Sequence, residues 1–297
     1  MATFNYSVII PHRSSLHLLP TLLSSIPDRK DIEIIVVDNS PHPIIKDDIL
    51  TNRNVTVLFS SQSVYAGGAR NVGLDFAQGK WILFADADDY FSENAFDLFD
   101  RYLLSDHDII FFGVSSYYLG TNEKSERAVM YQEMVEKFLN NSSSELDIRL
   151  MHRVPWAKMI KKSLIDKNNL RFEEIRAAED AFFALKVGYY AKTISADIST
   201  AYILTDSYNS LSRQKTFDAL HATLLSRLNI NLFLKQKMLD KYQVSVMLVL
   251  LQIIKYYPRK FFIVIKDVIL SKQNPFIGCT RWMRTLRKVY KNKNVFV

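Results

Sequence analysis

Three carboxylates stand together directly after a short uncharged segment. The segment Trp81 to Ala85 is apolar and favours a buried strand, and Asp86, Asp88 and Asp89 follow it. Open α/β sheets bind ligands outside the carboxyl ends of their strands. An Asp-x-Asp pair supplies the hard oxygen ligands that a divalent cation prefers. A solvated acidic turn that caps the next helix would have the same sequence, so the rest of the chain has to separate the two interpretations.

Two further groups are expected at the same edge of the sheet. The segment 31–37 (DIEIIVV) is a second predicted strand, and it ends at Asp38. Gly67 and Gly68 then open a predicted helix whose first turn carries Arg70. Paired glycines allow a close backbone approach or a positive φ. Because free N–H groups at a helix start and a guanidinium both bind phosphate or carboxylate, the edge is expected to hold a cation and an anionic ligand.

Strand-like and helix-like segments alternate along the first half of the chain. The predicted strands cover residues 7–10, 31–37, 55–59, 81–85 and 108–113, and the predicted helices cover 16–26, 67–78 and 94–104. Such alternation predicts an α/β domain with a mostly parallel sheet and right-handed crossovers.

The remaining elements of this domain are less regular in sequence. The first strand is expected to stop at Pro11, and residues 114–150 are expected to be polar and irregular. A helix-like stretch is predicted from Pro155, a further helix over 176–190, and short strands near 193 and over 199–204.

Charge divides the 297 residues into two parts. The chain has a net charge of +7, but from Lys215 onward 16 Lys and Arg face 3 Asp and Glu, a net of +13, which leaves −6 for the first 214 residues. We therefore predict a mildly acidic α/β domain over 1–213 and a basic, mostly helical region over 214–297, including a helix over 280–290. A basic amphipathic region suggests an anionic membrane surface as its partner.

Cysteine content and hydropathy bear on the compartment. The single Cys279 excludes an internal disulfide framework and a cysteine zinc cluster, and it fits a reducing compartment. The first residues lack the basic start and long apolar run of a signal peptide. The uncharged run 242–254 is shorter than the roughly 20 apolar residues that span a bilayer. We expect a cytoplasmic protein, with peripheral attachment to the inner face of the cell membrane as an option.

Six motifs occur in the order and spacing of one enzyme family. They are SVIIP (7–11), EIIVVD (33–38), GARNVGL (68–74), FADADD (84–89), PWAK (155–158) and EDAFFA (179–184). Over roughly residues 4 to 213 the chain resembles the family 2 inverting, nucleotide-sugar-dependent glycosyltransferases of the GT-A fold, of the non-processive bacterial type. The resemblance does not extend to the basic C-terminal region.

The resemblance implies a donor site. Asp38 would accept a hydrogen bond from the pyrimidine ring of the donor, and Pro11 would line the nucleotide pocket. Arg70 would face the base or the diphosphate. Arg213 lies in the SLSR segment 210–213, after the predicted helix over 176–190, and is a candidate for contact with the diphosphate.

The resemblance also implies the metal and the base. Asp86, Ala87 and Asp88 would form the DXD motif, with Asp86 near the ribose and the metal and Asp88 coordinating Mn²⁺ or Mg²⁺. Asp180 would be the general base, although the adjacent Glu179 could take that role. Trp156 would either line the sugar and acceptor pocket or belong to the core, and Lys158 would be structural or solvated. His12, His152 and His221 lack the spacing of metal ligands.

The chain departs from the family pattern at three places. Asp38-Asn39-Ser40 replaces the commoner Asp-Asp-Gly-Ser, and Ala178 precedes Glu179 where glycine is usual. The Gln-x-x-Arg-Trp signature of processive members is missing, so one sugar is expected to be transferred per binding event.

The expected partners follow from these assignments. They are a nucleoside-diphosphate sugar, most often a UDP-sugar in this family, and a glycan or lipid-linked saccharide acceptor of cell-surface polysaccharide synthesis. Three alternatives compete with this function: an inactive sugar-nucleotide-binding module, a basic module that binds nucleic acid or membrane, and a metal-dependent sugar nucleotidyltransferase. We expect no nucleic-acid partner, since carboxylates gathered at strand ends would repel phosphate unless a cation intervenes. The nucleotidyltransferase would need a basic phosphate loop near the N-terminus, and the sequence shows none there.

Overall fold

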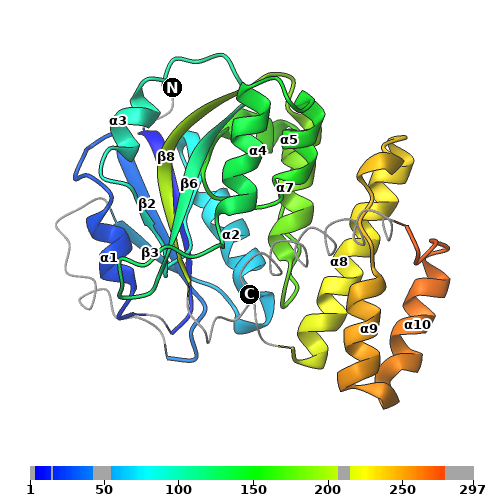
Figure 1. Ribbon diagram of the computed structural model, residues 1–297. Helices are drawn as coiled ribbons and strands as arrows, with labels where there is room; N and C mark the ends of the chain where they lie inside the picture. The colour runs from blue at the N-terminus through cyan, green and yellow to red at the C-terminus, as the bar shows by residue number, and fades with distance from the viewer. Residues whose placement is uncertain (1–3, 15, 43–54, 207–214, 278–297) are drawn as a thin grey trace, which may run out of the picture. The chain divides into compact units, whose positions relative to one another are not determined.

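The chain forms two compact units, Met1–Arg213 and Gln214–Val297 (Figure 1). The structure is a computed structural model, and it describes residues 4–14, 16–42, 55–206 and 215–277. Every strand described belongs to the first unit, and the described part of the second unit is helical. Each unit is treated separately below.

The first unit is built on one eight-stranded sheet. Its strands are β1 (Phe4–His12), β2 (Ile32–Asp38), β3 (Val55–Phe59), β4 (Gly79–Phe84), β5 (Tyr90–Phe91), β6 (Ile109–Tyr118), β7 (Lys158–Lys161) and β8 (Ile194–Asp206). They lie in the order β3-β2-β1-β4-β7-β6-β8-β5. The pairs β1–β2, β1–β4, β2–β3 and β6–β8 are parallel, while β7 and β5 pair antiparallel with their neighbours. The predicted α/β class with a mostly parallel sheet is confirmed.

Helices cover both faces of this sheet (Figure 1). They are α1 (Leu19–Ser24), α2 (Tyr65–Phe76), α3 (Ala95–Asp100), α4 (Val129–Leu139), α5 (Glu145–Met151), α6 (Lys162–Lys167) and α7 (Glu179–Tyr190). Side chains alternate along each strand, so Val8 and Ile10 of β1 join a core with α1 and α3. Ile9 faces the other way, into a core shared with α2, α4, α5, α6 and α7.

The first strand does not stop at Pro11 as predicted. β1 continues to His12, and Pro11 lies opposite Val37 of β2. The pairing of β1 with β4 ends at Ile9, so beyond that point β1 has β2 alone as a neighbour. Proline is tolerated there because its missing N–H falls on the unpaired side of the strand.

Residues 114–150 are also more regular than predicted. β6 runs on to Tyr118, and α4 and α5 follow. A capping box between Ser144 and Asp147 starts α5, and this pattern was present in the sequence. The stretch expected to be helix-like from Pro155 contains the strand β7 first, and the helix α6 follows it at Lys162. The two short strands expected after residue 193 are one long strand, β8.

The paired glycines pack helix α2 tightly and do not adopt a positive φ. A Cβ on Gly67 would lie 2.0 Å from the carbonyl oxygen of Glu173, and one on Gly68 would lie 2.3 Å from Cβ of Val64. Both positions are inside α2. The glycines therefore allow close contact between parts of the protein, where the sequence had left open an approach to a ligand.

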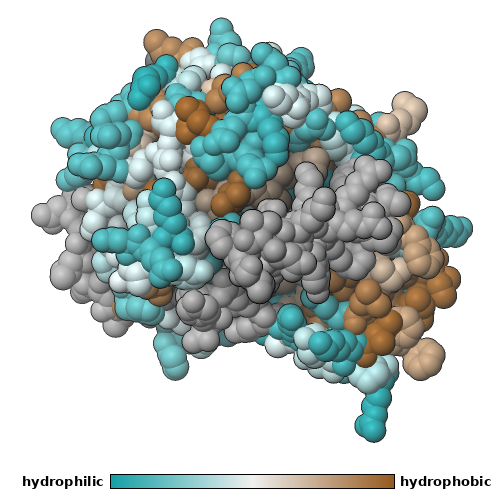
Figure 2. All heavy atoms as spheres, viewed as in Figure 1, coloured by the Kyte–Doolittle hydropathy of each residue, from teal (hydrophilic) through white to brown (hydrophobic). Residues whose placement is uncertain are grey.

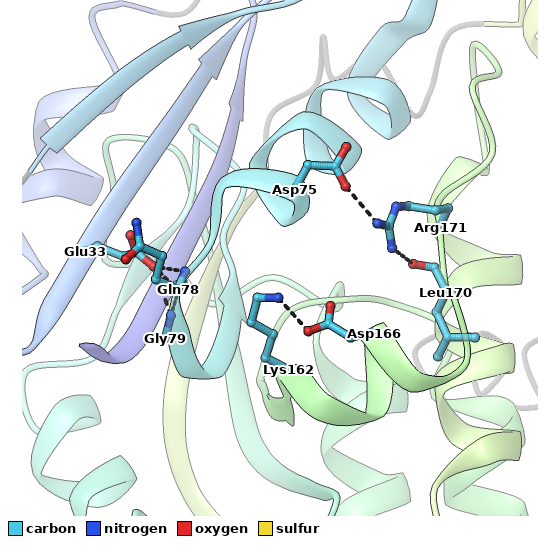
Figure 3. Close-up of polar contacts among 9 residues, drawn as sticks. Glu33, Asp75, Gln78, Gly79, Lys162, Asp166, Leu170 and Arg171 are labelled. Atoms are coloured by element: carbon cyan, nitrogen blue, oxygen red, sulfur yellow. Dashed lines mark hydrogen bonds and ion pairs between the residues drawn. The ribbon is translucent and has the colours of Figure 1, made fainter. Parts of the chain in front are cut away.

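A buried glutamate fixes the start of β4. Glu33 accepts hydrogen bonds from the backbone N–H groups of Gln78 (2.5 Å) and Gly79 (3.0 Å), and also from the hydroxyl of Ser7 (Figure 3). Gly79 also donates to the Ser7 hydroxyl at 2.7 Å. These bonds connect the beginnings of β1, β2 and β4, so they set the position from which β4 runs towards Asp86.

The second unit is a small helical assembly. It contains α8 (Phe217–Gln236), α9 (Met247–Tyr256) and α10 (Phe261–Leu270), which pack around Leu224, Ile253 and Val264. Thr216 caps α8 through the backbone N–H of Ala219. The helix predicted over 280–290 lies outside the described residues. None of the helices described here is both long and apolar enough to cross a bilayer.

Candidate functional site

Burial separates the three carboxylates that follow β4. Asp86 is half-buried, Asp88 is exposed, and Asp89 is buried with only 1% of its surface exposed to solvent. Ala87 is buried between the first two. Desolvation and the neighbouring charge of Asp86 raise the pKa of Asp88, although this side chain remains open to solvent on one side. Asp86 and Asp88 are therefore the two carboxylates of this segment that a ligand can reach.

Asp89 is directed into the protein. Its Oδ2 accepts a hydrogen bond from the Tyr202 hydroxyl at 3.1 Å, and its Oδ1 accepts one from the backbone N–H of Thr205 at 2.8 Å. Burial, followed by the charges of Asp88 and Asp86, raises its pKa well above the ordinary value. Asp89 thus holds the acidic segment against β8.

Arg70 bridges the acidic segment and helix α7. Its Nη2 donates to Asp86 at 2.6 Å and its Nη1 to Glu179 at 3.0 Å, with 4% of the residue exposed. The guanidinium also lies 5.3 Å from the centre of the Phe172 ring. Burial alone would lower the pKa of Arg70, but Asp86, Glu179 and Asp180 together raise it. The guanidinium is committed to two carboxylates, whereas the sequence had predicted contact with the donor.

The start of α7 carries the two candidate bases. Glu179 pairs with Arg70, while Asp180 has a pKa raised to about 7. The main cause is desolvation, and the charge of Glu179 adds to it, while Arg70 acts in the opposite direction. A carboxyl group with a pKa near neutrality can accept a proton and release it at working pH. These properties favour Asp180 over Glu179 as a base.

Ala178 explains why the family prefers glycine before this helix. Its φ of 59° and ψ of 25° lie in the left-handed region, immediately before α7 begins at Glu179. A residue with a Cβ pays roughly 1–2 kcal/mol for this conformation. The turn that brings the first-turn carboxylates to face Arg70 is kept here despite that cost.

Pro11 and Asp38 lie near the carboxyl ends of the neighbouring strands β1 and β2, but Asp38 is turned inward. Its Oδ1 is 2.9 Å from Nδ1 of His12 and accepts hydrogen bonds from the hydroxyl (2.5 Å) and backbone N–H (3.2 Å) of Ser40. Asp38 is 1% exposed, and Pro11 is partly exposed. The Asp38 carboxylate is therefore already occupied, so Pro11 is the more accessible of the two.

Trp156 belongs to the core. It is 4% exposed, stacks on Tyr202 with ring centres 5.8 Å apart and planes 6° from parallel, and meets the edge of Tyr131 at 4.8 Å. Of the two interpretations that the sequence allowed, this placement favours a core residue over a sugar platform.

Lys158 is buried, and the charge of Asp180 acts on it. Its Nζ donates to the carbonyl oxygens of His152 (2.6 Å) and Val154 (2.8 Å), and burial lowers its pKa to about 7, while the charge of Asp180 acts to raise it. His152 is fully buried, and within the described residues neither of its ring nitrogens has a hydrogen-bond partner. Neither residue is solvated, so the structural interpretation of Lys158 is the one observed.

The sequence did not point to two residues that precede or begin α4. Arg127 donates through Nη1 to the carbonyl of Thr205 at 2.5 Å. Burial would lower the pKa of Arg127, but the charges of Asp89, Asp86 and Asp88 raise it. Burial, with the charge of Asp180 adding to it, raises the pKa of Tyr131 to about 12. Their region had been predicted irregular, so nothing placed them at the site; Arg213, which had been predicted there, lies outside the described residues.

The carboxylates suit a cation that shares its ligands with a substrate. Within the described residues no group of three or more His, Cys, Asp and Glu side chains could hold a metal ion by itself. Asp86 and Asp88 offer two accessible carboxylates, and Mg²⁺ sites are typically completed by water and phosphate oxygens. The residues therefore fit a metal that is bound together with a diphosphate.

Comparison with known proteins places this geometry in a family. The model of "Glycosyl transferase family 2" matches residues 7–168, which is more than half of the chain. The chain belongs to glycosyl transferase family 2. This match contains β4, the acidic segment and Arg70, and it confirms the resemblance seen in the motifs.

Two relatives are named as transferases of the same polymer, poly(ribitol-phosphate). The poly(ribitol-phosphate) beta-N-acetylglucosaminyltransferase TarS of Staphylococcus aureus is 27% identical over 207 residues, 66% of this chain and 35% of the relative. The poly(ribitol-phosphate) beta-glucosyltransferase of Bacillus spizizenii is 28% identical over 212 residues, 67% of this chain and 32% of the relative. The chain thus spans about a third of the length of these relatives.

A solved structure confirms the GT-A fold of this family 2 member. Residues 1–349 of S. aureus TarS in complex with UDP-GlcNAc match with a TM-score of 0.65 and 20% identity, covering 85% of this chain and 73% of that chain. At this identity the likeness concerns the fold.

Removal of the Arg70 bridge should destabilise this family 2 domain. Arg70→Met leaves Asp86 and Glu179 without their shared cation, and we expect the free energy of unfolding to fall by about 3 kcal/mol. Arg171→Met is the control, because Arg171 pairs with an exposed Asp75 at the surface (Figure 3) and should cost less than about 1 kcal/mol. Urea denaturation at pH 7 measures both. Equal losses would contradict the bridging role.

Proposed function

We propose that this family 2 enzyme transfers one sugar from a nucleoside-diphosphate donor, a UDP-sugar, to a hydroxyl group of a glycan or lipid-linked saccharide, with inversion. The observation that carries the proposal is the connection of Asp180, whose pKa is about 7, through Glu179 and Arg70 to Asp86. The proposed base and the proposed cation site are thereby connected through the ion pairs of Arg70. Cell-surface polysaccharide synthesis is the proposed setting, supported by the polymer names of the relatives.

The donor side of the proposed site is formed by Asp86, Ala87 and Asp88. Asp88 and Asp86 would hold Mn²⁺ or Mg²⁺, which when bound supplies positive charge to the diphosphate leaving group. Asp86 is already oriented by Arg70, so one of its oxygens is committed and the other remains for the ligand. Pro11 and Asp38, at the ends of β1 and β2, would border the nucleotide, and Arg213 remains a proposed contact of the diphosphate.

The acceptor side is formed by the start of α7. Asp180 would take the proton from the acceptor hydroxyl as its oxygen attacks the anomeric carbon, and attack opposite the leaving diphosphate inverts the configuration. The ion pair with Glu179 holds the guanidinium of Arg70 at the start of α7. Tyr131 contacts Trp156, and the charge of Asp180 acts on the Tyr131 hydroxyl. Without a processive signature, release after one transfer is expected.

The base assignment predicts the dependence of the reaction on pH. Asp180 accepts a proton only when ionised, so kcat/KM should rise with pH through an apparent pKa of about 7. Asp180→Asn should lower kcat by about 10²–10⁴-fold and remove this rise, while the KM for the donor changes little. Glu174→Gln, which alters an exposed carboxylate of the preceding segment, is the control. Transfer by Asp180→Asn at the wild-type rate would refute the assignment.

The donor assignment predicts metal-dependent binding through Asp88. A screen of nucleoside-diphosphate sugars by thermal shift should find one that raises the Tm of the wild type only with Mn²⁺ or Mg²⁺. Asp88→Ala should lose this rise, and Asp97→Ala, an exposed aspartate on α3, should keep it. If no donor raises the Tm with metal present, the chain does not use such donors. A donor that binds without any Asp180-dependent transfer would indicate the alternative, an inactive sugar-nucleotide-binding module.

We also propose that the second unit attaches the enzyme to the inner face of an anionic membrane. Four large apolar side chains are 66–78% exposed on or after α10, namely Phe262, Ile269, Leu270 and Phe276. Figure 2 shows hydrophobic side chains gathered on the α10 part of this unit. Exposed cations accompany them, at Lys255, Arg259, Lys260, Lys266 and Lys272. Apolar side chains bordered by Lys and Arg match a surface of anionic lipid.

Vesicle flotation tests the membrane proposal. The wild type should float with vesicles that contain anionic lipid and stay behind with neutral ones, and higher salt should weaken the binding. The double variant Phe262→Glu/Leu270→Glu should lose flotation. Leu104→Glu, at a still more exposed leucine of the first unit, should keep it. Equal behaviour of the wild type with both vesicle types would exclude an anionic membrane as the partner.

A further inference from the structure

We propose that Tyr202 is a positioning residue, whose hydroxyl group fixes the backbone between β4 and β5 and with it the spacing of Asp86 and Asp88. The inference rests on the proposed function, because it explains how the two cation ligands are held. Tyr202 belongs to β8, more than a hundred residues away in sequence, and it is fully buried.

One hydroxyl group serves both ends of the acidic segment. The Tyr202 oxygen accepts a hydrogen bond from the backbone N–H of Asp86 at 2.9 Å, and its proton is donated to Oδ2 of Asp89 at 3.1 Å. A phenol has one proton and acceptor lone pairs, so a single Tyr202 can make both bonds at once. A single oxygen atom is therefore hydrogen-bonded to both ends of the segment 86–89.

Thr205 adds a second attachment from the same strand. Its backbone N–H donates to Oδ1 of Asp89 at 2.8 Å, and its hydroxyl donates to the backbone carbonyl of Asp88. Beyond the segment, Phe91 of β5 pairs directly with Tyr202 in the sheet. The backbone of each aspartate in the segment, or its side chain, thus bonds to β8.

The Tyr202 ring cannot easily move. Trp156 stacks on one side of it with planes 6° from parallel, and Phe91 meets its edge with ring centres 5.5 Å apart. The hydroxyl position is set by these rings, because the side chain has no freedom left once they are in place. Trp156 thereby acquires a role in the site although it does not reach solvent: it supports the residue that holds the cation ligands.

The geometry has a specific consequence for the reaction. A cation bound by two carboxylates and a diphosphate needs those carboxylates held to within about 0.5 Å. Loss of the Tyr202 hydroxyl should loosen Asp86 and Asp88 and weaken metal and donor binding. Asp180 lies on α7 and is not bonded to Tyr202, so the rate of the bound complex should change much less.

Tyr202→Phe removes the hydroxyl and keeps the ring. The matched control is Tyr102→Phe, because the Tyr102 hydroxyl also bonds to an aspartate of β8, Asp197, at 3.0 Å, but away from the acidic segment. We expect Tyr202→Phe to raise the KM for the donor and the Kd for Mn²⁺ by about tenfold, because the backbone N–H of Asp86 and the carboxyl group of Asp89 both lose their hydrogen bond to the hydroxyl. Its kcat should stay within about threefold of wild type, and Tyr102→Phe should match the wild type in both constants.

Amide hydrogen exchange tests the same idea without any ligand. Exchange in the peptide 85–91 should accelerate in Tyr202→Phe and not in Tyr102→Phe. Thr205→Val, which keeps its N–H and loses its hydroxyl, should accelerate exchange in the same peptide because it removes the other β8 hydroxyl bonded there. If Tyr202→Phe does not fold, the Asp86 amide of the wild type decides: its acceptor is the Tyr202 hydroxyl, so it should be protected, and exchange at the unprotected rate would overturn the proposal. Unchanged exchange and unchanged Kd would overturn the proposal. If the wild type binds no donor, the proposed function fails, and the exchange result still decides whether Tyr202 positions the segment.

Discussion

The site depends on one buried guanidinium. Arg70 stands between Asp86 and Glu179, with Asp180 adjacent, so it is the cation that allows carboxylates from two distant segments to lie close together in a poorly solvated place. Removing either kind of charge would leave the other desolvated and unpaired, which is far more costly than never burying them. The end of β4 and the start of α7 are therefore joined electrostatically as well as by packing.

Around Arg70, the aspartate carboxyl groups have different roles because their surroundings differ. Asp88 is open and can meet a ligand, Asp89 is enclosed by β8, and Asp180 is desolvated enough to hold a proton near neutral pH. No property of an isolated aspartate distinguishes the three. The fold assigns their roles through exposure, neighbouring charge and hydrogen bonding.

The sequence predicted what is local and missed what depends on distant contacts. The strands that lead to Asp38 and Asp86 were visible in the sequence as apolar runs followed by polar residues. The order of the motifs assigned Arg70 and Asp180 to the same site. That Arg70 faces two carboxylates, and that Asp38 faces His12, required the fold, since partners separated by 16 to 109 positions leave no local pattern. Arg127 and Tyr202 were overlooked for the same reason.

The hydrogen bonds of the buried Glu33 fix the number of residues between the start of β4 and the acidic segment. The backbone is held at Gly79 at one end of the strand and at Asp86 at the other, and both ends are hydrogen-bonded to other strands. An inserted or deleted residue between them would displace the acidic segment by about 3.3 Å and exchange the two faces of the strand. An added residue in a surface loop of this domain would leave these attachments in place, whereas one between Gly79 and Asp86 would break the hydrogen bonds at one end or the other.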